Sequence, residues 1–107
     1  EAQEKYYELT SVEADHSTIP EGFVLEQNYP NPFNPSTAIK FGIPEASNIR
    51  LKIFNSLGEE VVELVNEYME AGTYTYNFDA SKLPSGIYVY TLQSSEQLIS
   101  KKMTLIK

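Results

Sequence analysis

Three prolines fall within six positions of the stretch Leu25–Thr37, which reads LEQNYPNPFNPST. Proline fixes its own φ, lacks a backbone donor and pushes the preceding residue into an extended conformation, so no helix or paired central strand can run through this stretch. Asparagine before proline favours a turn, because its side chain bonds the backbone two residues on. The stretch therefore predicts a stiff, extended crossover that Tyr29 and Phe33 anchor to a sandwich edge.

Beyond Gly22, apolar and polar residues alternate with a period of two, which is typical of strands with one buried face. Asn55-Ser56-Leu57-Gly58 predicts a tight hairpin turn, with Gly58 at a positive φ. Asn66 to Gly72 is predicted to be a connection. The pattern predicts seven strands, at Phe23–Gln27, Ile39–Ile43, Ile49–Phe54, Glu59–Val65, Thr73–Phe78, Ile87–Gln93 and Gln97–Ile106.

Seven short strands without a helix predict an all-β fold, an immunoglobulin-like β-sandwich of about seven antiparallel strands. A small barrel is the alternative. Both faces of Ile87–Gln93 are apolar, which predicts a central strand of a packed sheet. Val61, Val62, Leu64 and Val65 do not alternate cleanly, which indicates a bulge or an early exit of this strand. Leu83 is expected to plug the core from a loop, and Tyr88 is a candidate tyrosine corner.

Residues 1–19 are polar and acidic, and we interpret them as a linker or the tail of a preceding domain. A short alternation predicts a strand at Tyr6–Thr10 within them. Pro20-Glu21-Gly22 marks the boundary, so residues 20–107 are the expected domain. No run approaches the roughly eighteen apolar residues of a membrane helix, and the first residues do not resemble a signal peptide. We expect that this chain does not insert into a membrane and that it is part of a longer protein, which carries the export leader.

Catalytic and metal chemistry finds little support in the composition. His16 is the single histidine, cysteine is absent, and the polar segment around His16 predicts a solvated side chain. These features argue against a zinc site and against nucleophilic machinery, so no enzyme activity and no cofactor are expected. Asn77, Asp79 and Ser81 have the oxygen spacing of a calcium loop, and an Asx-type turn is the alternative. The net charge of −7 argues against nucleic-acid binding.

Five short motifs, in order along the chain, resemble those of a known family. They are NPFNPST, Asn55-Ser56-Leu57-Gly58, Ala71-Gly72, Ser85-Gly86-Ile87-Tyr88 and the closing Lys102-Met103-Thr104-Leu105. From about Phe23 to Lys107, the chain resembles the C-terminal sorting domains of type IX secretion cargo, of type A in the Por secretion system family. The first nineteen residues lie outside this resemblance.

The resemblance implies a non-catalytic C-terminal signal that the type IX outer-membrane translocon recognises. Such a domain travels with an N-terminal cargo, covalently joined to it, to the cell surface or the medium. A sortase-like protease commonly removes it and attaches the cargo to surface lipopolysaccharide. The acidic segment before Pro20 would then be the unpaired tether, with residues 10–19 suitable for cleavage.

The last predicted strand is the basic end of an acidic chain, since residues 97–107 contain three lysines and no acid. One reading is a solvated edge that lysines protect against aggregation. The other is an edge that a partner reads through backbone register and electrostatic attraction. An edge awaiting a partner can also pair with a second copy. The predicted partner-binding residues are Lys101, Lys102, Met103, Leu105 and Lys107.

Two other functions fit the same fold. An accessory immunoglobulin-like module, similar to that of flagellar hook-capping proteins, would support an appendage or an enzyme. A carbohydrate-binding module would need a row of exposed aromatic side chains. Burial of Tyr74, Tyr76, Tyr88 and Tyr90 would dismiss that possibility.

Overall fold

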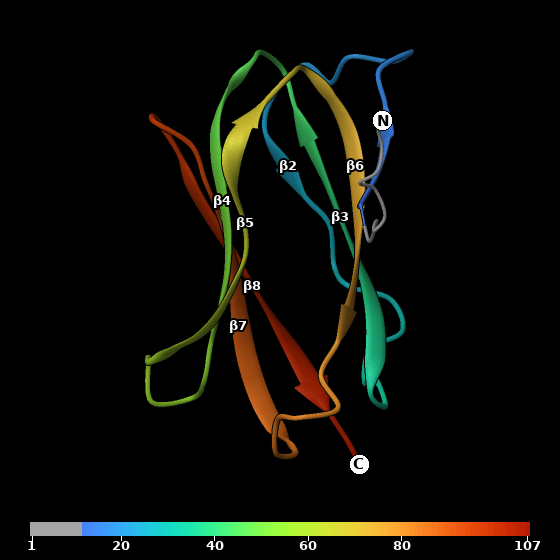
Figure 1. Cartoon of the computed structure of the whole chain (residues 1–107), viewed down its shortest axis with the longest axis vertical. Coiled ribbons are helices and arrows are strands. Elements are labelled where there is room, and N and C mark those ends of the chain that lie inside the picture. The colour runs from blue at the N-terminus through green and yellow to red at the C-terminus, as the bar shows by residue number, and fades with distance from the viewer. Residues whose placement is uncertain (1–11) are drawn as a thin grey trace, which may run out of the picture.

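Two four-stranded antiparallel sheets, packed face to face, make up the computed structural model, which describes residues 12–107 (Figure 1). The β6 sheet has the order β1-β6-β3-β2 and the β7 sheet the order β5-β4-β7-β8. The β6 sheet contains β1 (Val12–Asp15), β2 (Val24–Leu25), β3 (Ser36–Ile43) and β6 (Gly72–Asp79). The β7 sheet contains β4 (Ser47–Phe54), β5 (Glu60–Met69), β7 (Gly86–Gln93) and β8 (Leu98–Leu105). The predicted β-sandwich is confirmed, and the small barrel is wrong because the sheets are separate.

The core lies between the sheets and is built from the alternating residues of each strand. Successive side chains on a strand point to opposite faces, so every second residue meets the other layer. Two triplets with 0% exposure show this, Ile39, Phe41 and Ile43 on β3 and Ile49, Leu51 and Ile53 on β4. β7 lies between β4 and β8, which confirms its central position in the sheet. Leu83 packs against this core from its loop, as predicted.

The hairpin between β4 and β5 confirms the predicted turn. Gly58 has a φ of 85°, and the Asn55 side-chain oxygen accepts bonds from the backbone N–H groups of Leu57 and Glu59. Register shifts in the β4–β5 pairing confirm a bulge. The predicted connection Asn66–Gly72 is wrong at its start, because β5 stays paired with β4 as far as Met69. This part of the edge strand β5 is paired through its backbone but shows no apolar alternation, so the sequence pattern did not predict it.

Two tyrosines close the loops that precede their strands in the same way. The Tyr88 hydroxyl donates to the Pro84 carbonyl at 2.6 Å, which confirms the predicted tyrosine corner. The Tyr74 hydroxyl donates to the Glu70 carbonyl, also at 2.6 Å. Each ring comes two residues after a glycine and bonds the carbonyl four residues upstream. A repeated Gly-x-Tyr in the sequence is therefore a signal for both corners.

The structure is described from Val12, within the segment predicted to be a linker or the tail of a preceding domain. Val12–Asp15 forms β1 and pairs with Thr73–Tyr76 of β6. His16, predicted to be solvated, is exposed, but its Nδ1–H donates to the Ala71 carbonyl at 2.8 Å. Its ring also meets Tyr74 edge-on, with centroids 5.6 Å apart. Val12–Asp15 contains two acidic residues and gave no pattern of apolar alternation, so the sequence did not predict the pairing of β1 with β6. The predicted strand Tyr6–Thr10 lies outside the described residues.

The crossover between β2 and β3 anchors through one aromatic ring rather than two. Phe33 is 2% exposed and joins the core, as predicted. Tyr29 is 81% exposed, so its predicted anchoring role is wrong. Its backbone bridges Ala38 of β3, which places the Tyr29 side chain on the outer face of the sheet. The peptide bonds before Pro30, Pro32 and Pro35 are cis.

Candidate recognition surface at the terminal strand

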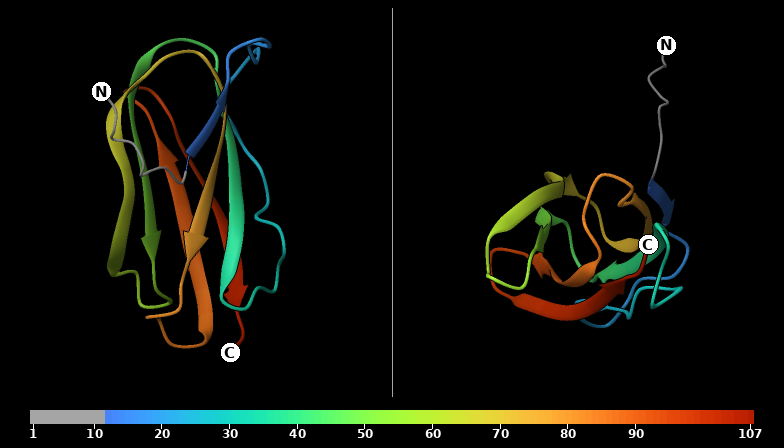
Figure 2. Two further views of the ribbon diagram at one scale, coloured as in Figure 1. Left: turned by 45° about the vertical axis from the view of Figure 1, so that its right-hand side comes forward. Right: turned by 90° about the horizontal axis from the view of Figure 1, so that it is seen from below.

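The strand β8 is an edge strand of the β7 sheet, but the crossover covers its C-terminal half (Figure 2). The Phe33 N–H donates to the Thr104 carbonyl, and the Ile106 N–H donates to the Phe33 carbonyl, both at 2.9 Å. The Thr104 N–H donates to the Asn31 side-chain oxygen at 2.9 Å. The predicted accessible edge is therefore closed beside Thr104 and Ile106.

The N-terminal half of β8 leaves its outer edge open. The Gln27 side chain donates to the Lys102 carbonyl at 2.7 Å, which is the last covering bond. Backbone groups on a strand point alternately to its two neighbours, so Leu98 and Ser100 point outward as Lys102 and Thr104 do. Among residues 12–107, no partner bonds the outward backbone groups of Ser100. We name the segment Leu98–Lys102 the free edge.

A buried polar cluster holds the crossover in place. The Tyr90 hydroxyl donates to the Glu26 carbonyl at 2.7 Å and accepts from the Asn28 N–H at 2.8 Å. The Asn28 side chain, 2% exposed, donates to the Thr37 hydroxyl and the Pro30 carbonyl. Burial raises the pKa of Tyr90, which is 0% exposed. The alternating pattern did not reveal this cluster, because polar residues are expected outside the core.

Two of the predicted partner-binding side chains lie in the core. Met103 and Leu105 are 0% and 1% exposed. They cannot touch a partner while the domain is folded, because strand alternation turns them toward the other sheet. Their prediction as contact residues is corrected on that ground.

The three predicted lysines differ in what they contact. Lys107 is exposed, but its Nζ donates to the Ser81 and Leu83 carbonyls at 2.6 and 2.7 Å. Lys101 is half-buried and shares the inner face with Met103. Lys102 is exposed on the outer face and forms no ion pair with a described carboxylate. Lys102 is therefore the lysine of this strand best placed to meet a partner.

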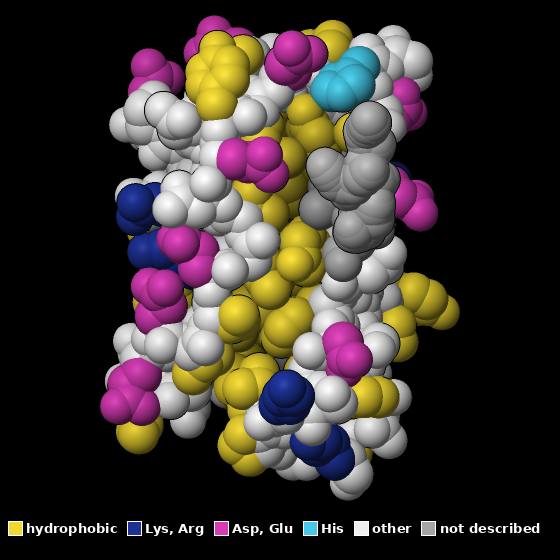
Figure 3. Space-filling model, viewed as in Figure 1, with side chains coloured by type: hydrophobic (Ala, Val, Ile, Leu, Met, Phe, Trp, Pro, Cys, Tyr) yellow, Lys and Arg dark blue, Asp and Glu magenta, His cyan; other side chains and the backbone are white. Residues whose placement is uncertain are grey.

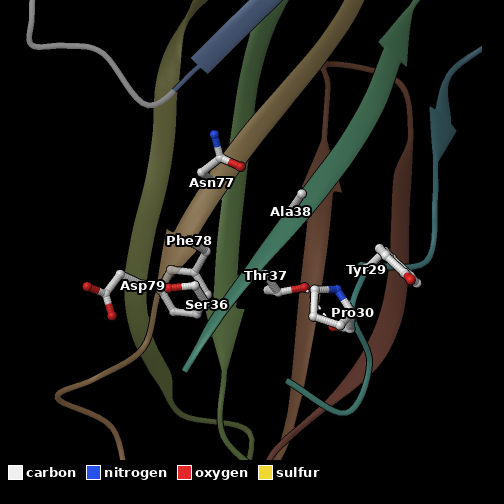
Figure 4. Close-up of a pocket in the computed structure, with 8 residues that line it drawn as sticks. All are labelled: Tyr29, Pro30, Ser36, Thr37, Ala38, Asn77, Phe78 and Asp79. Atoms are coloured by element: carbon white, nitrogen blue, oxygen red, sulfur yellow. Dashed lines mark hydrogen bonds between the residues drawn. The ribbon is translucent and has the colours of Figure 1, made fainter. Parts of the chain in front are cut away.

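Two open hollows lie away from the terminal strand. A shallow pocket of about 370 Å³ lies beside Tyr29, and Asn77 and Asp79 project from β6 next to it (Figure 4). Figure 3 shows apolar side chains between the sheets on the side where β5 faces β6, and a hollow of about 360 Å³ there includes Val62 and Leu83. Asp79 lines both hollows, with Ser36 and Thr37 in the first and Ser81 and Lys82 in the second.

The candidate cation residues form a turn. The Asp79 carboxylate accepts a bond from the Ser81 N–H at 2.9 Å, which is the Asx-type alternative. In the part of the chain that the structure describes, no three metal-ligating side chains gather. Within the same residues, no helix is long and apolar enough to cross a membrane.

The tyrosines do not form the row that carbohydrate binding would need. Tyr74, Tyr88 and Tyr90 are at most 5% exposed, and Tyr76 is partly buried against the core. The carboxylates of β5 are partly neutralised, since Lys52 Nζ lies 3.2 Å from a Glu60 carboxylate oxygen and 4.0 Å from one of Glu63. Neither observation favours a sugar-binding or hydrolytic site.

Comparison with known proteins gives one family match. The family described as "Secretion system C-terminal sorting domain" matches residues 27–107. A search of curated proteins finds no match to the chain. The matched region begins at the glutamine that bonds Lys102 and includes the crossover, every strand from β3 to β8 and the free edge.

Proposed function

The chain belongs to the family of secretion system C-terminal sorting domains, and from this membership we propose a specific role for it. Residues 20–107 are the folded signal by which the type IX outer-membrane machinery recognises a cargo joined to their N-terminal side. The machinery then carries that cargo to the cell surface or the medium. The observation that carries the proposal is the match over residues 27–107, which contains both the crossover and the terminal strand.

The free edge is where the machinery binds the folded domain. An extended segment of the machinery adds beside Leu98–Lys102 and bonds the outward backbone groups of Ser100. Lys102 supplies attraction to a carboxylate of the partner, which steers the encounter and fixes the register. Met103 and Leu105 support the strand from the core, and Lys107 holds the loop before β7.

Removal by a sortase-like protease fits the N-terminal side of the domain, with one restriction. A protease needs an extended, unpaired segment. Val12–Asp15 is paired with β6, so cleavage within it requires that β1 first leaves the sheet. We therefore propose that the protease cuts outside Val12–Asp15 while the domain stays folded.

The proposal is tested by fusing the chain to a periplasm-directed reporter in a bacterium with a type IX secretion system. The wild-type fusion is expected at the surface or in the medium. Lys102→Glu should leave the reporter in the periplasm, while Lys40→Glu, a change at an exposed lysine on the β6 sheet, should not. If the folded wild-type fusion stays in the periplasm, the sorting role is wrong. Export of the Lys102→Glu fusion would remove only the role of Lys102.

A further inference from the structure

Over the ends of β4 and β7 that lie far from the C-terminus, the outward side chains of these two strands are polar, with the exposed Leu98 and Tyr68 on the flanking strands β8 and β5. The register places Arg50 beside Gln93. It also places Thr91 between Lys52 and Ser100. The outer side of an antiparallel sandwich sheet normally faces water, so this half needs no covering layer.

The same face becomes apolar toward the start of β7 and the end of β8, near the C label in Figure 1. The register places Val89 between Phe54 and Lys102, and Ile87 opposite Thr104. Ile87 and Ile106 are each 52% exposed, while Phe54 and Val89 are half-buried. We name Phe54, Ile87, Val89 and Ile106 the outer apolar patch.

The residues of the outer apolar patch point away from the core. Their neighbours along the strands, Ile53, Tyr88 and Leu105, are buried between the sheets, so alternation turns the patch outward. No element among residues 12–107 lies over this face, because the β7 sheet packs against the β6 sheet on its other side. Both faces of Ile87–Gln93 are apolar at the start of the strand, and among the described residues the β6 sheet covers the inner face alone.

On the opposite outer face of the molecule, the exposed apolar side chains Val24 and Tyr29 lie at the β2 edge, and the outward positions of the central strands β3 and β6 do not form such a patch. On the β6 sheet, Lys40 pairs with Thr75, and Ala38 pairs with Asn77. These outward positions are polar or small. A cluster of four neighbouring apolar side chains on an outer face is typical of a surface that docks on a partner.

We propose that the outer apolar patch is a docking surface for a protein component of the export machinery, one with an apolar contact beside a carboxylate. The inference rests on the proposed function and names the face that the machinery uses. Charge complementarity favours this occupant. Lys102 borders Val89 and has no described carboxylate partner, whereas Lys52 on the same face is neutralised by Glu60 at 3.2 Å.

The outer apolar patch and the free edge meet at Lys102. A strand added beside the free edge would lie about 4.8 Å from β8 in the plane of the sheet, next to the patch. One partner can therefore bond the edge and cover the patch in a single contact. Apolar contacts at the centre of such an interface supply most of its affinity, while a bordering charge selects the partner.

The test uses the full 107-residue chain fused to the periplasm-directed reporter. Ile87→Glu and Ile106→Glu place a charge in the patch. Tyr68→Glu places the same charge at a side chain that is 64% exposed on β5, at the opposite edge of the sheet from the free edge. Export by each patch variant should fall about tenfold, the usual scale for a lost interface anchor. Export by the Tyr68→Glu fusion should match the wild type. Ile106 lies outside β8, so its variant tests the patch even where Ile87→Glu disturbs the strand.

A photo-crosslinking residue at position 87 identifies what covers the patch in the exporting cell. An adduct with an outer-membrane export component supports the proposal. Wild-type export from both patch variants, or an adduct formed with a second copy of the chain alone, overturns it while the sorting role stands. A wild-type fusion that stays in the periplasm overturns the sorting role and the docking surface together.

Discussion

At the scale of single residues, the Tyr90 hydroxyl joins β7 to the crossover through its bonds with Glu26 and Asn28. Tyr90→Phe keeps the ring but leaves the buried Asn28 N–H without its acceptor. The free energy of unfolding should fall by about 1–3 kcal/mol, the usual cost of an unsatisfied buried group. Urea denaturation measures the change. The control is Tyr29→Phe at an 81% exposed ring, where a shift beyond about 0.5 kcal/mol would be unexpected.

The dependence of the unfolding free energy on alkaline pH should also reveal the burial of Tyr90. Burial raises the pKa of Tyr90 above its ordinary value of 10.0, so the unfolded chain releases this proton at a lower pH than the folded one. The contribution of Tyr90 to stability is complete below pH 10.0 and is lost as pH rises through the folded pKa. The unfolding free energy of the wild type should fall more steeply above pH 10 than that of Tyr90→Phe. Parallel pH profiles in urea denaturation would contradict this.

At the scale of elements, Gly72 allows β1 to approach β6. A Cβ there would lie 2.7 Å from His16 Nδ1 and 2.8 Å from the Asp15 carbonyl oxygen, and φ is +154°. Gly86 has a similar φ of +158° and nothing within 4 Å of an added Cβ, so it is a matched control for backbone strain. Gly72→Ala should lower the unfolding free energy by about 1–3 kcal/mol more than Gly86→Ala, the usual cost of overpacking. Equal losses by urea denaturation would show that the close approach carries no cost.

The half-buried Lys101 points inward from an edge strand, which is one way sandwich proteins keep their edges from pairing with other chains. Lys101→Val removes that charge from the free edge. The average mass of the variant should therefore rise with concentration more than that of the wild type, as light scattering measures. Lys82→Val, at an exposed loop lysine, should behave as the wild type does. If the Lys101→Val variant stays monomeric, Lys101 is not the residue that prevents the free edge from pairing with other chains.

The strands were predictable where local pattern decides them and not where distant contacts do. Alternation was sufficient for β3, β4, β7 and β8, because one face of each meets the core. It missed β1, whose residues pair through their backbone without an apolar pattern. The proline-rich stretch predicted the same anchoring role for Tyr29 and Phe33, although only Phe33 reaches β8. The half of the β8 edge that the crossover covers depends on hydrogen bonds between residues that are 73 or 75 positions apart in the sequence. No local pattern reveals such contacts.

At the scale of the whole molecule, the first and last described strands are held to the fold by different kinds of contact. Met103 and Leu105 fill the core, and the backbone beyond them bonds the crossover at Phe33. At the other end, β1 contributes four residues at the edge of the β6 sheet, with His16 bonding Ala71. The terminal strand is therefore both part of the fold and part of the surface proposed to be read.

This asymmetry predicts how the domain responds to shortening. Removing residues 103–107 deletes two core side chains worth about 2–5 kcal/mol each and uncovers Phe33, against a total stability of about 5–15 kcal/mol for a domain. The shortened chain should unfold, whereas removing residues 1–19 should leave a cooperative domain of lower stability. Circular dichroism during thermal unfolding distinguishes the two. A cooperative transition of the C-terminally shortened chain at the wild-type temperature would contradict the prediction. Because loss of the terminal residues should abolish the fold itself, point changes on the outer face are the variants that separate recognition from folding.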